Sequence, residues 1–209
     1  MDLKKILGQF IALDGPDGCG KTTQVKLLVD CLAKQGVDVV SFREPGATAI
    51  GEKIRQILLN PEHIAMTTAA EVMLYMAARV QLWNEKISPA LKADKCVVAD
   101  RWLSSTCAYQ GFAGGLGIKK VIDIAEHSLE RSWPDLTIII DVDLQTAKKR
   151  IKRSFDRMER KTAAYHKKVR SGFLKLAGLR DDVIVLDAQA DIKTVHKKII
   201  QIIEKHFSS

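Results

Sequence analysis

Short apolar runs recur along the chain, and each is followed by a stretch with helical periodicity. The runs are FIALD, VDVVSF, KCVVAD, LTIIID and DDVIVLD, which begin at residues 10, 37, 95, 136 and 181. Runs that are apolar throughout, rather than alternating, are typical of strands covered on both faces. Strands that alternate with helices predict an α/β fold built on a mainly parallel sheet.

The helical stretches carry recognisable start and stop signals. Four apolar residues spaced i, i+3, i+4 and i+7 from Val25 predict a helix that begins at Lys21 and ends before Gly36. A capping box over residues 68–71, with Thr68 as the cap, predicts a second helix, and the Ser88-Pro89 pair predicts the cap and first turn of a third. The segment GFAGGLG, residues 111–117, is expected to be a flexible connection.

Length and composition indicate one domain over residues 1–209. The chain is 46% hydrophobic, enough for a substantial core, and no stretch separates it into two parts. No apolar stretch approaches the roughly 20 residues of a membrane span, and the opening MDLKKILGQF does not resemble a signal peptide. We therefore expect a cytoplasmic protein, whose four cysteines are thiols rather than zinc ligands.

The net charge of +8 comes from one segment. Residues 148–175 contain twelve lysines and arginines but only two acidic residues, Asp156 and Glu159. The simplest interpretation is a solvated helix face. The denser run KKRIKRSFDR within it has the character of a phosphate clamp. No nucleic acid is therefore expected as a partner, and a nucleic-acid-binding protein is the less favoured alternative.

A phosphate-binding motif directly follows the first apolar run. The spacing G-x-x-x-x-G-K-T is that of a loop whose amides wrap the phosphates of a nucleoside triphosphate, here ATP. A lysine in this loop reaches the β- and γ-phosphates, and the hydroxyl after it is a ligand for Mg²⁺. The predicted ATP-binding residues are Gly15, Pro16, Asp17, Gly18, Cys19, Gly20, Lys21 and Thr22.

Polar residues follow three further strands. REPG occupies residues 43–46, DRW residues 100–102 and DVD residues 141–143. Each alone is consistent with a helix cap or a surface ion pair, but the carboxyl ends of parallel strands share one crevice. None of the five histidines lies at a strand end. An acceptor that is itself a phosphate needs no such base, since it is already ionised at neutral pH.

In order and spacing, eight segments of the chain resemble the bacterial thymidylate kinases. They are GPDGCGKTT at 15–23, REPG at 43–46, YMAARVQ at 75–81, DRWLSSTCAYQG at 100–111, WPDLT at 133–137, DRME at 156–159, VRSGFLKLA at 169–177 and VLDA at 185–188. The resemblance implies a P-loop kinase fold, with a five-stranded parallel sheet flanked by helices and a basic lid at about 150–160. It further implies phosphoryl transfer from ATP to dTMP with Mg²⁺, and a homodimer.

The resemblance also implies roles for individual residues. The catalytic set is Lys21, Asp100, Arg101, Arg153 and Arg157. The dTMP-binding set is Asp17, Arg43, Tyr75, Arg79, Arg101, Ser105, Thr106, Tyr109 and Gln110. Within these sets the two arginines at strand ends grip the acceptor phosphate, Tyr75 stacks on the base, Arg79 binds a base carbonyl and Tyr109 closes the ribose 2′ position. Thr22 and Asp17 form the expected metal region.

Four positions bear on how closely the chain follows the family. Trp102 replaces a commoner tyrosine or histidine and is expected to narrow the acceptor pocket, while Ala47 stands where the motif often continues with glycine. Tyr75 replaces phenylalanine, so a kinase for dUMP, UMP or CMP stays an alternative. Some members carry arginine where this chain has Gly18, and others supply that charge from the lid. We expect the lid to supply it here, through Arg153 and through Arg157 positioned by its acidic neighbours.

Overall fold

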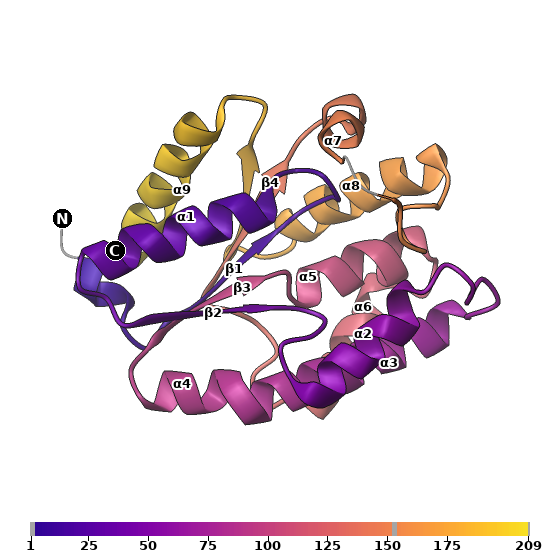
Figure 1. The fold of residues 1–209 in the computed structure, drawn as a ribbon, viewed down its shortest axis with the longest axis horizontal. Coiled ribbons are helices and arrows are strands. Elements are labelled where there is room, and N and C mark those ends of the chain that lie inside the picture. Colours follow the sequence, from indigo (N-terminus) through magenta and orange to yellow (C-terminus); the bar gives the residue numbers. More distant parts are fainter. Residues whose placement is uncertain (1–2, 152–153, 209) are drawn as a thin grey trace.

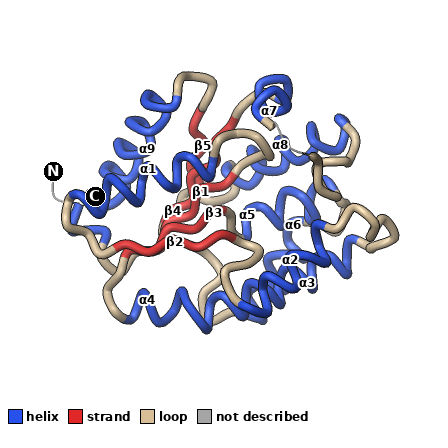
Figure 2. The backbone as a smooth tube through the Cα atoms, viewed as in Figure 1, coloured by secondary structure: helices blue, strands red, loops and turns tan. Residues whose placement is uncertain are grey.

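The five apolar runs form a single sheet in a computed structural model of the chain, which describes residues 3–151 and 154–208. All neighbouring strands are parallel, in the order β2-β3-β1-β4-β5. Figures 1 and 2 show the sheet between two layers of helices. The strands are β1 (Phe10–Asp14), β2 (Val39–Arg43), β3 (Cys96–Asp100), β4 (Leu136–Asp141) and β5 (Val183–Asp187). The expected five-stranded parallel α/β fold is confirmed.

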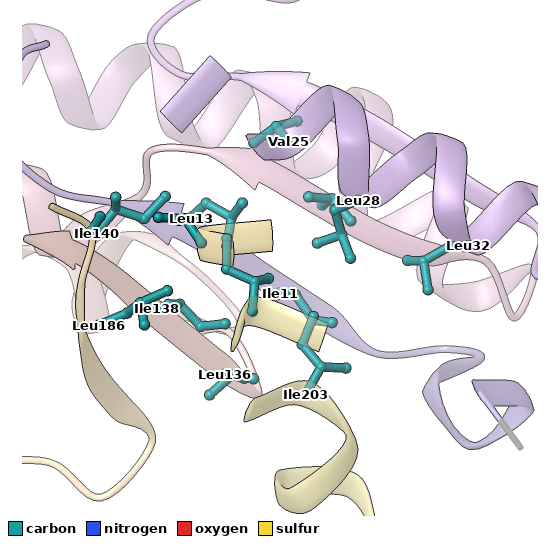
Figure 3. Close-up of a cluster of buried hydrophobic side chains, with 14 of the residues drawn as sticks. Ile11, Leu13, Val25, Leu28, Leu32, Leu136, Ile138, Ile140, Leu186 and Ile203 are labelled. Carbon is teal, nitrogen blue, oxygen red and sulfur yellow. The ribbon is translucent and has the colours of Figure 1, made fainter. Parts of the chain in front are cut away.

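Helices α1 (Lys21–Lys34) and α9 (Ile192–Phe207) cover one face of the sheet. Because side chains alternate along a strand, Ile11 and Leu13 of β1 point to this face. Figure 3 shows them among aliphatic side chains of α1 and β4. This layer fixes the start of α1, and with it the phosphate-binding loop, against the end of β1.

Helices α3 (Thr68–Leu82) and α6 (Ile118–Ser128) cover the other face, where they meet Phe10 and Ala12 of β1. Helix α8 (Ala163–Ala177) packs beside them, with Phe173 in a smaller cluster. The shorter elements are η1 (Leu3–Ile6), α2 (Ala49–Leu59), η2 (Trp83–Ile87), α4 (Ser88–Lys92), α5 (Leu103–Thr106), η3 (Cys107–Ala113) and α7 (Leu144–Arg150).

Two of the expected helix starts are wrong in detail. Thr67, not Thr68, caps α3, since its side chain accepts from the amide of Ala70. Ser88 caps nothing, because the chain runs from α3 through the π-helical turn η2 into α4 without leaving helical geometry. Proline is compatible with this path at the first turn of α4, where its missing N–H breaks no ladder of α4 itself.

The segment GFAGGLG is only partly a loop. Its first residues complete the π-helix η3, and Gly111 is buried beneath α6. A Cβ at Gly111 would lie 3.2 Å from Cα of Ile118, which is closer than an ordinary van der Waals contact. The remaining residues form the turn into α6.

Candidate active site

The phosphate-binding loop connects β1 to α1. Gly15, Gly18 and Gly20 all have positive φ, at 138°, 78° and 99°, which turns successive loop amides toward one space. Lys21 is buried and its ammonium lies across the loop, donating to the carbonyls of Gly15 at 3.0 Å and Pro16 at 2.7 Å. The loop therefore presents amides, a helix start and one lysine to the same point.

Helix α7 backs this loop. A Cβ at Gly18 would lie 2.2 Å from the carbonyl oxygen of Ala147, so only glycine fits here. Arg150, at the end of α7, donates to the carbonyls of Cys19 at 3.3 Å and Ala188 at 3.5 Å. The basic segment thus meets the phosphate-binding loop directly.

Thr22 and Asp100 provide adjacent oxygen ligands at the start of α1. The Thr22 hydroxyl donates to Oδ2 of Asp100 at 2.6 Å. A hydroxyl and a carboxylate beside the phosphate loop fit Mg²⁺, which usually keeps few protein ligands and takes the rest from phosphates and water. Asp17, the other residue expected near a metal, is instead engaged with Arg101 and Tyr109. Among the residues that the structure describes, no cluster of three or more His, Cys, Asp or Glu side chains has the arrangement of a metal site.

Asp14, the last residue of β1, joins the loop to the DRW turn. It is fully buried and accepts from the amide of Gly15 at 2.8 Å, Ser104 Oγ at 2.5 Å and Ser105 Oγ at 2.6 Å. It also pairs with Arg101 at 3.3 Å. One carboxylate thus fixes the relative position of the loop and the helix that follows β3.

Arg101 lies at the centre of the cleft in a left-handed conformation, with φ of 74°. Such backbone strain in a non-glycine residue is typical of functional sites. Its guanidinium bonds Asp17, the Gly15 carbonyl at 2.8 Å and Ser105 Oγ at 2.8 Å. Burial acts to lower the pKa of Arg101, but Tyr109, Asp17, Asp14 and Asp100 together raise it well above its usual value.

Asp17 is held as an anion on the same side of the cleft. Burial acts to raise the pKa of Asp17, but the charges of Arg101 and Lys21 and a hydrogen bond from Tyr109 hold it below its ordinary value. The Tyr109 hydroxyl donates to Oδ2 at 2.7 Å. Asp17 and Tyr109 are thus one unit facing the space beside Arg101.

Two further arginines lie in the cleft, Arg43 from the REPG turn and Arg55 from helix α2, which follows it. Arg43 is half-exposed and lies 3.4 Å from Glu52 of α2. Arg55, also from α2, donates to the carbonyl of Pro45 at 2.8 Å. Nothing in the periodicity of α2 marks Arg55 for this position, and the sequence analysis missed it. Ala47 has φ of 65°, which accounts for the usual glycine at its position.

Arg79 is fully buried and belongs to a polar cluster at the far end of the cleft. It donates to Oε2 of Glu44 at 2.8 Å and to Thr106 Oγ1 at 2.9 Å, and it forms an ion pair with Oε1 of Glu44 at 2.6 Å. Trp102 packs beneath it, 5.3 Å from ring centroid to guanidinium. The expectation that Trp102 narrows the pocket is wrong, because its ring is buried in the core against Phe10.

Most of the polar residues described above line one cavity of about 820 Å³. The phosphate loop, the REPG turn and the helices after β3 and β5 all contribute to it. The predicted residues that line it are Asp17, Gly18, Cys19, Gly20, Lys21, Thr22, Arg43, Tyr75, Arg79, Asp100, Arg101, Ser105, Thr106, Tyr109 and Gln110. Its volume is in the range of small-molecule sites.

Arg157 of the lid segment is placed differently from expectation. Arg157 is not positioned by Asp156 or Glu159. It is buried, its Nε donates to the Leu58 carbonyl at 2.7 Å, and it pairs closely with Glu71 of α3. Arg153 lies outside the described residues.

Several site residues escaped the sequence analysis. Asp14 ended a strand and was indistinguishable from a core boundary, and Glu44 stood inside a motif noted for its arginine. Glu71 was assigned as a helix-capping residue, yet it accepts from Arg157 and Gln110 inside the fold. From the sequence alone, a buried glutamate in a helix cannot be distinguished from an exposed one.

A phosphate loop for one substrate and a facing set of arginines for another anionic group define a P-loop kinase with a phosphorylated acceptor. The model of the thymidylate kinase family matches residues 13–199. The chain belongs to the thymidylate kinase family.

Individual relatives span nearly the whole chain. A protein of Thermoanaerobacter sp. (strain X514) named thymidylate kinase is 43% identical over 201 residues, covering 95% of this chain and 98% of its own. One of Thermosipho africanus with the same name is 39% identical over 201 residues, covering 96% and 100%. The crystal structure of thymidylate kinase from Ehrlichia chaffeensis superposes with a TM-score of 0.76 at 30% identity, covering 94% of this chain and 98% of that one.

Within the described ranges 3–151 and 154–208, the helices are too short or too polar to span a bilayer.

The contact between Gly18 and α7 predicts unequal costs for two alanine substitutions in the loop. Gly20→Ala places a Cβ at positive φ with no close contact, 4.0 Å from Nη1 of Arg150, so it should lower the free energy of unfolding by only about 1–2 kcal/mol. Gly18→Ala carries the same backbone penalty and also collides with Ala147, so it should cost a further 1–3 kcal/mol or so. Urea denaturation of both variants measures the difference, and equal costs would show that α7 does not rest on the loop.

Proposed function

We infer that the protein transfers the γ-phosphoryl group of ATP to dTMP, giving ADP and dTDP. The observation that carries the inference is one cleft in which the loop at Lys21 faces Arg43 and Arg101. Membership of the thymidylate kinase family selects this reaction among those that such a cleft permits. A kinase for dUMP, UMP or CMP and a nucleic-acid-binding ATPase are less favoured, since the named relatives share the thymidylate kinase name.

The chain's own residues perform positioning and charge stabilisation. The loop amides and Lys21 hold the phosphates of ATP, and Arg43 and Arg101 hold the phosphate of dTMP. The transferred group carries spread negative charge in the transition state, so fixed cations around it lower the barrier. Asp14 and Asp17 keep Arg101 in place and charged, because both lie against its guanidinium.

We place Mg²⁺ at Thr22 and Asp100. When bound, the ion neutralises phosphate charge and aligns the polyphosphate. Asp17, beside Tyr109, contacts the sugar of dTMP instead of the metal. Tyr75, Arg79 and Gln110 surround the base, with Ser105 and Thr106 completing that end of the cleft.

We also propose that the protein acts in the cytoplasm as a homodimer. Exposed apolar side chains on neighbouring helices support a second copy as partner: Ile50 and Ile57 on α2, and Met73 on α3. Ile50 and Ile57 are seven residues apart and so lie on one side of α2, which packs against α3. A paired face of this kind would stiffen α2, which carries Arg55 into the cleft.

The first experiment is Lys21→Ala. Its ammonium donates to two loop carbonyls and to Sγ of Cys19 in the same loop, so the variant should fold but lose phosphoryl transfer by about 10²-fold or more in kcat. Coupled ADP release with a panel of nucleosides and monophosphates measures this. Lys26→Ala, on the exposed side of the same helix, is the control and should keep parental turnover. Normal turnover of Lys21→Ala would refute the ATP site.

Tyr109 should determine sugar preference. Its ring lies beside Asp17 and leaves a 2′-hydroxyl crowded and without a partner, so dTMP should exceed ribothymidine monophosphate in kcat/KM by about 10-fold or more. Tyr109→Phe retains the ring and should retain the preference, whereas Tyr109→Leu should reduce it. Equal kcat/KM for the two sugars in the parent protein would remove this role from Tyr109.

The lid should supply the cation that Gly18 does not. Arg150 already contacts the loop, which supports a lid arginine near the transferred group. Arg153→Ala is expected to lower kcat by about 10³-fold or more with little change in dTMP affinity, because such a contact strengthens in the transition state. Lys168→Ala, exposed on α8, is the matched control. Parental kcat in Arg153→Ala would show that Arg153 does not supply this cation.

A further inference from the structure

Glu71 is a buried carboxylate that contacts two parts of the site at once. It is 3% exposed and extends from α3. One carboxylate oxygen pairs with Arg157 of the lid segment, and the other accepts from Nε2 of Gln110 at 3.0 Å.

The charge of Glu71 determines which way the Gln110 amide faces. A carboxylate paired with arginine offers only acceptors, whereas an amide has an NH₂ end that donates and an oxygen that accepts. The NH₂ end of Gln110 must therefore face Glu71. Gln110 lines the cleft, and in the described part of the chain no donor bonds its Oε1. The atom available to a ligand is thus the amide oxygen.

A fixed acceptor at this point requires an N–H on the ligand. Thymine and uracil carry a hydrogen on N3, whereas cytosine has a lone pair there that would oppose the Gln110 oxygen. A site built to receive a donor rejects a ligand that lacks it, because a buried acceptor is left unpaired. The orientation of one amide is therefore sufficient to separate the two kinds of pyrimidine.

We propose that Glu71 is a positioning residue for base selection, which holds the oxygen of Gln110 toward the base so that the site takes imide pyrimidines and excludes cytosine. The proposal rests on the proposed function, since it concerns the acceptor of that reaction. It does not separate dTMP from dUMP, because both carry the N3 hydrogen.

Glu71→Gln tests this directly. Arg157 is buried and still needs an acceptor, so the new amide turns its oxygen to Arg157 and its NH₂ group to Gln110. Gln110 then reverses and presents its own NH₂ group to the base, which matches the cytosine lone pair. The expected result is a fall of about 10-fold or more in the preference for dTMP over dCMP, with the preference for dTMP over dUMP kept within about two-fold.

Binding of dTMP, dUMP and dCMP is measured by isothermal titration calorimetry, and kcat/KM by coupled ADP release. In a Gln110→Ala background, Glu71→Gln should change the dTMP:dCMP ratio no further, because the effect passes through Gln110. Arg157→Lys is the control for the ion pair and should leave that ratio unchanged. If Glu71→Gln does not fold, the Glu71→Leu/Arg157→Met double variant removes both buried charges together. It leaves the Gln110 amide without the acceptor that orients it, so the dTMP:dCMP ratio should again fall, and an unchanged ratio would overturn the proposal.

The outcomes separate the two claims. An unchanged dTMP:dCMP ratio in Glu71→Gln, or an equal change in both ratios, overturns the role of Glu71 while the parent's preference for dTMP stands. A parent protein that binds and phosphorylates none of the three nucleotides overturns the proposed function itself.

Discussion

The site depends on the hydrogen bonds that the buried Asp14 carboxylate accepts. Asp14 ends the central strand β1 and accepts hydrogen bonds from the first residue of the phosphate loop and from the serines after β3. A buried carboxylate is costly unless it is fully hydrogen-bonded, so these partners are held tightly. The donor loop and the acceptor arginine consequently share one fixed reference point. Neither can shift without breaking bonds to the other.

The sheet follows the sequence closely because its pattern is simple. The inner strands β1, β3 and β4 are buried and apolar on both faces, whereas the edge strands β2 and β5 are partly exposed. All five runs could nevertheless be found without tertiary information. The phosphate loop is equally local, since its glycines and lysine are fixed by neighbouring residues. Helix ends are harder: Ser88 and Pro89 have the composition of a helix start, but packing of η2 and α4 carries the helix through them.

The polar network could not be predicted for a different reason. Arg79 has the spacing of an ordinary helix residue, and only the approach of the REPG turn gives it Glu44 as a partner. The sequence predicts that the acidic neighbours of Arg157 position it within a basic run, yet α3 supplies Glu71 and the fold buries both. Contacts between residues far apart in the chain cannot be predicted from the spacing of apolar and polar residues within one helix or strand.

The contact of Gly18 with Ala147 links two segments that the sequence presents as independent. Because the loop touches the backbone of α7, the residue at position 18 and the placement of that helix have to change together. A relative with a large side chain at position 18 would need α7 displaced or its connection to β4 rebuilt. In an alignment of such proteins, position 18 should therefore co-vary with the length and composition of residues 142–150, and chimeras that exchange one segment without the other should lose stability.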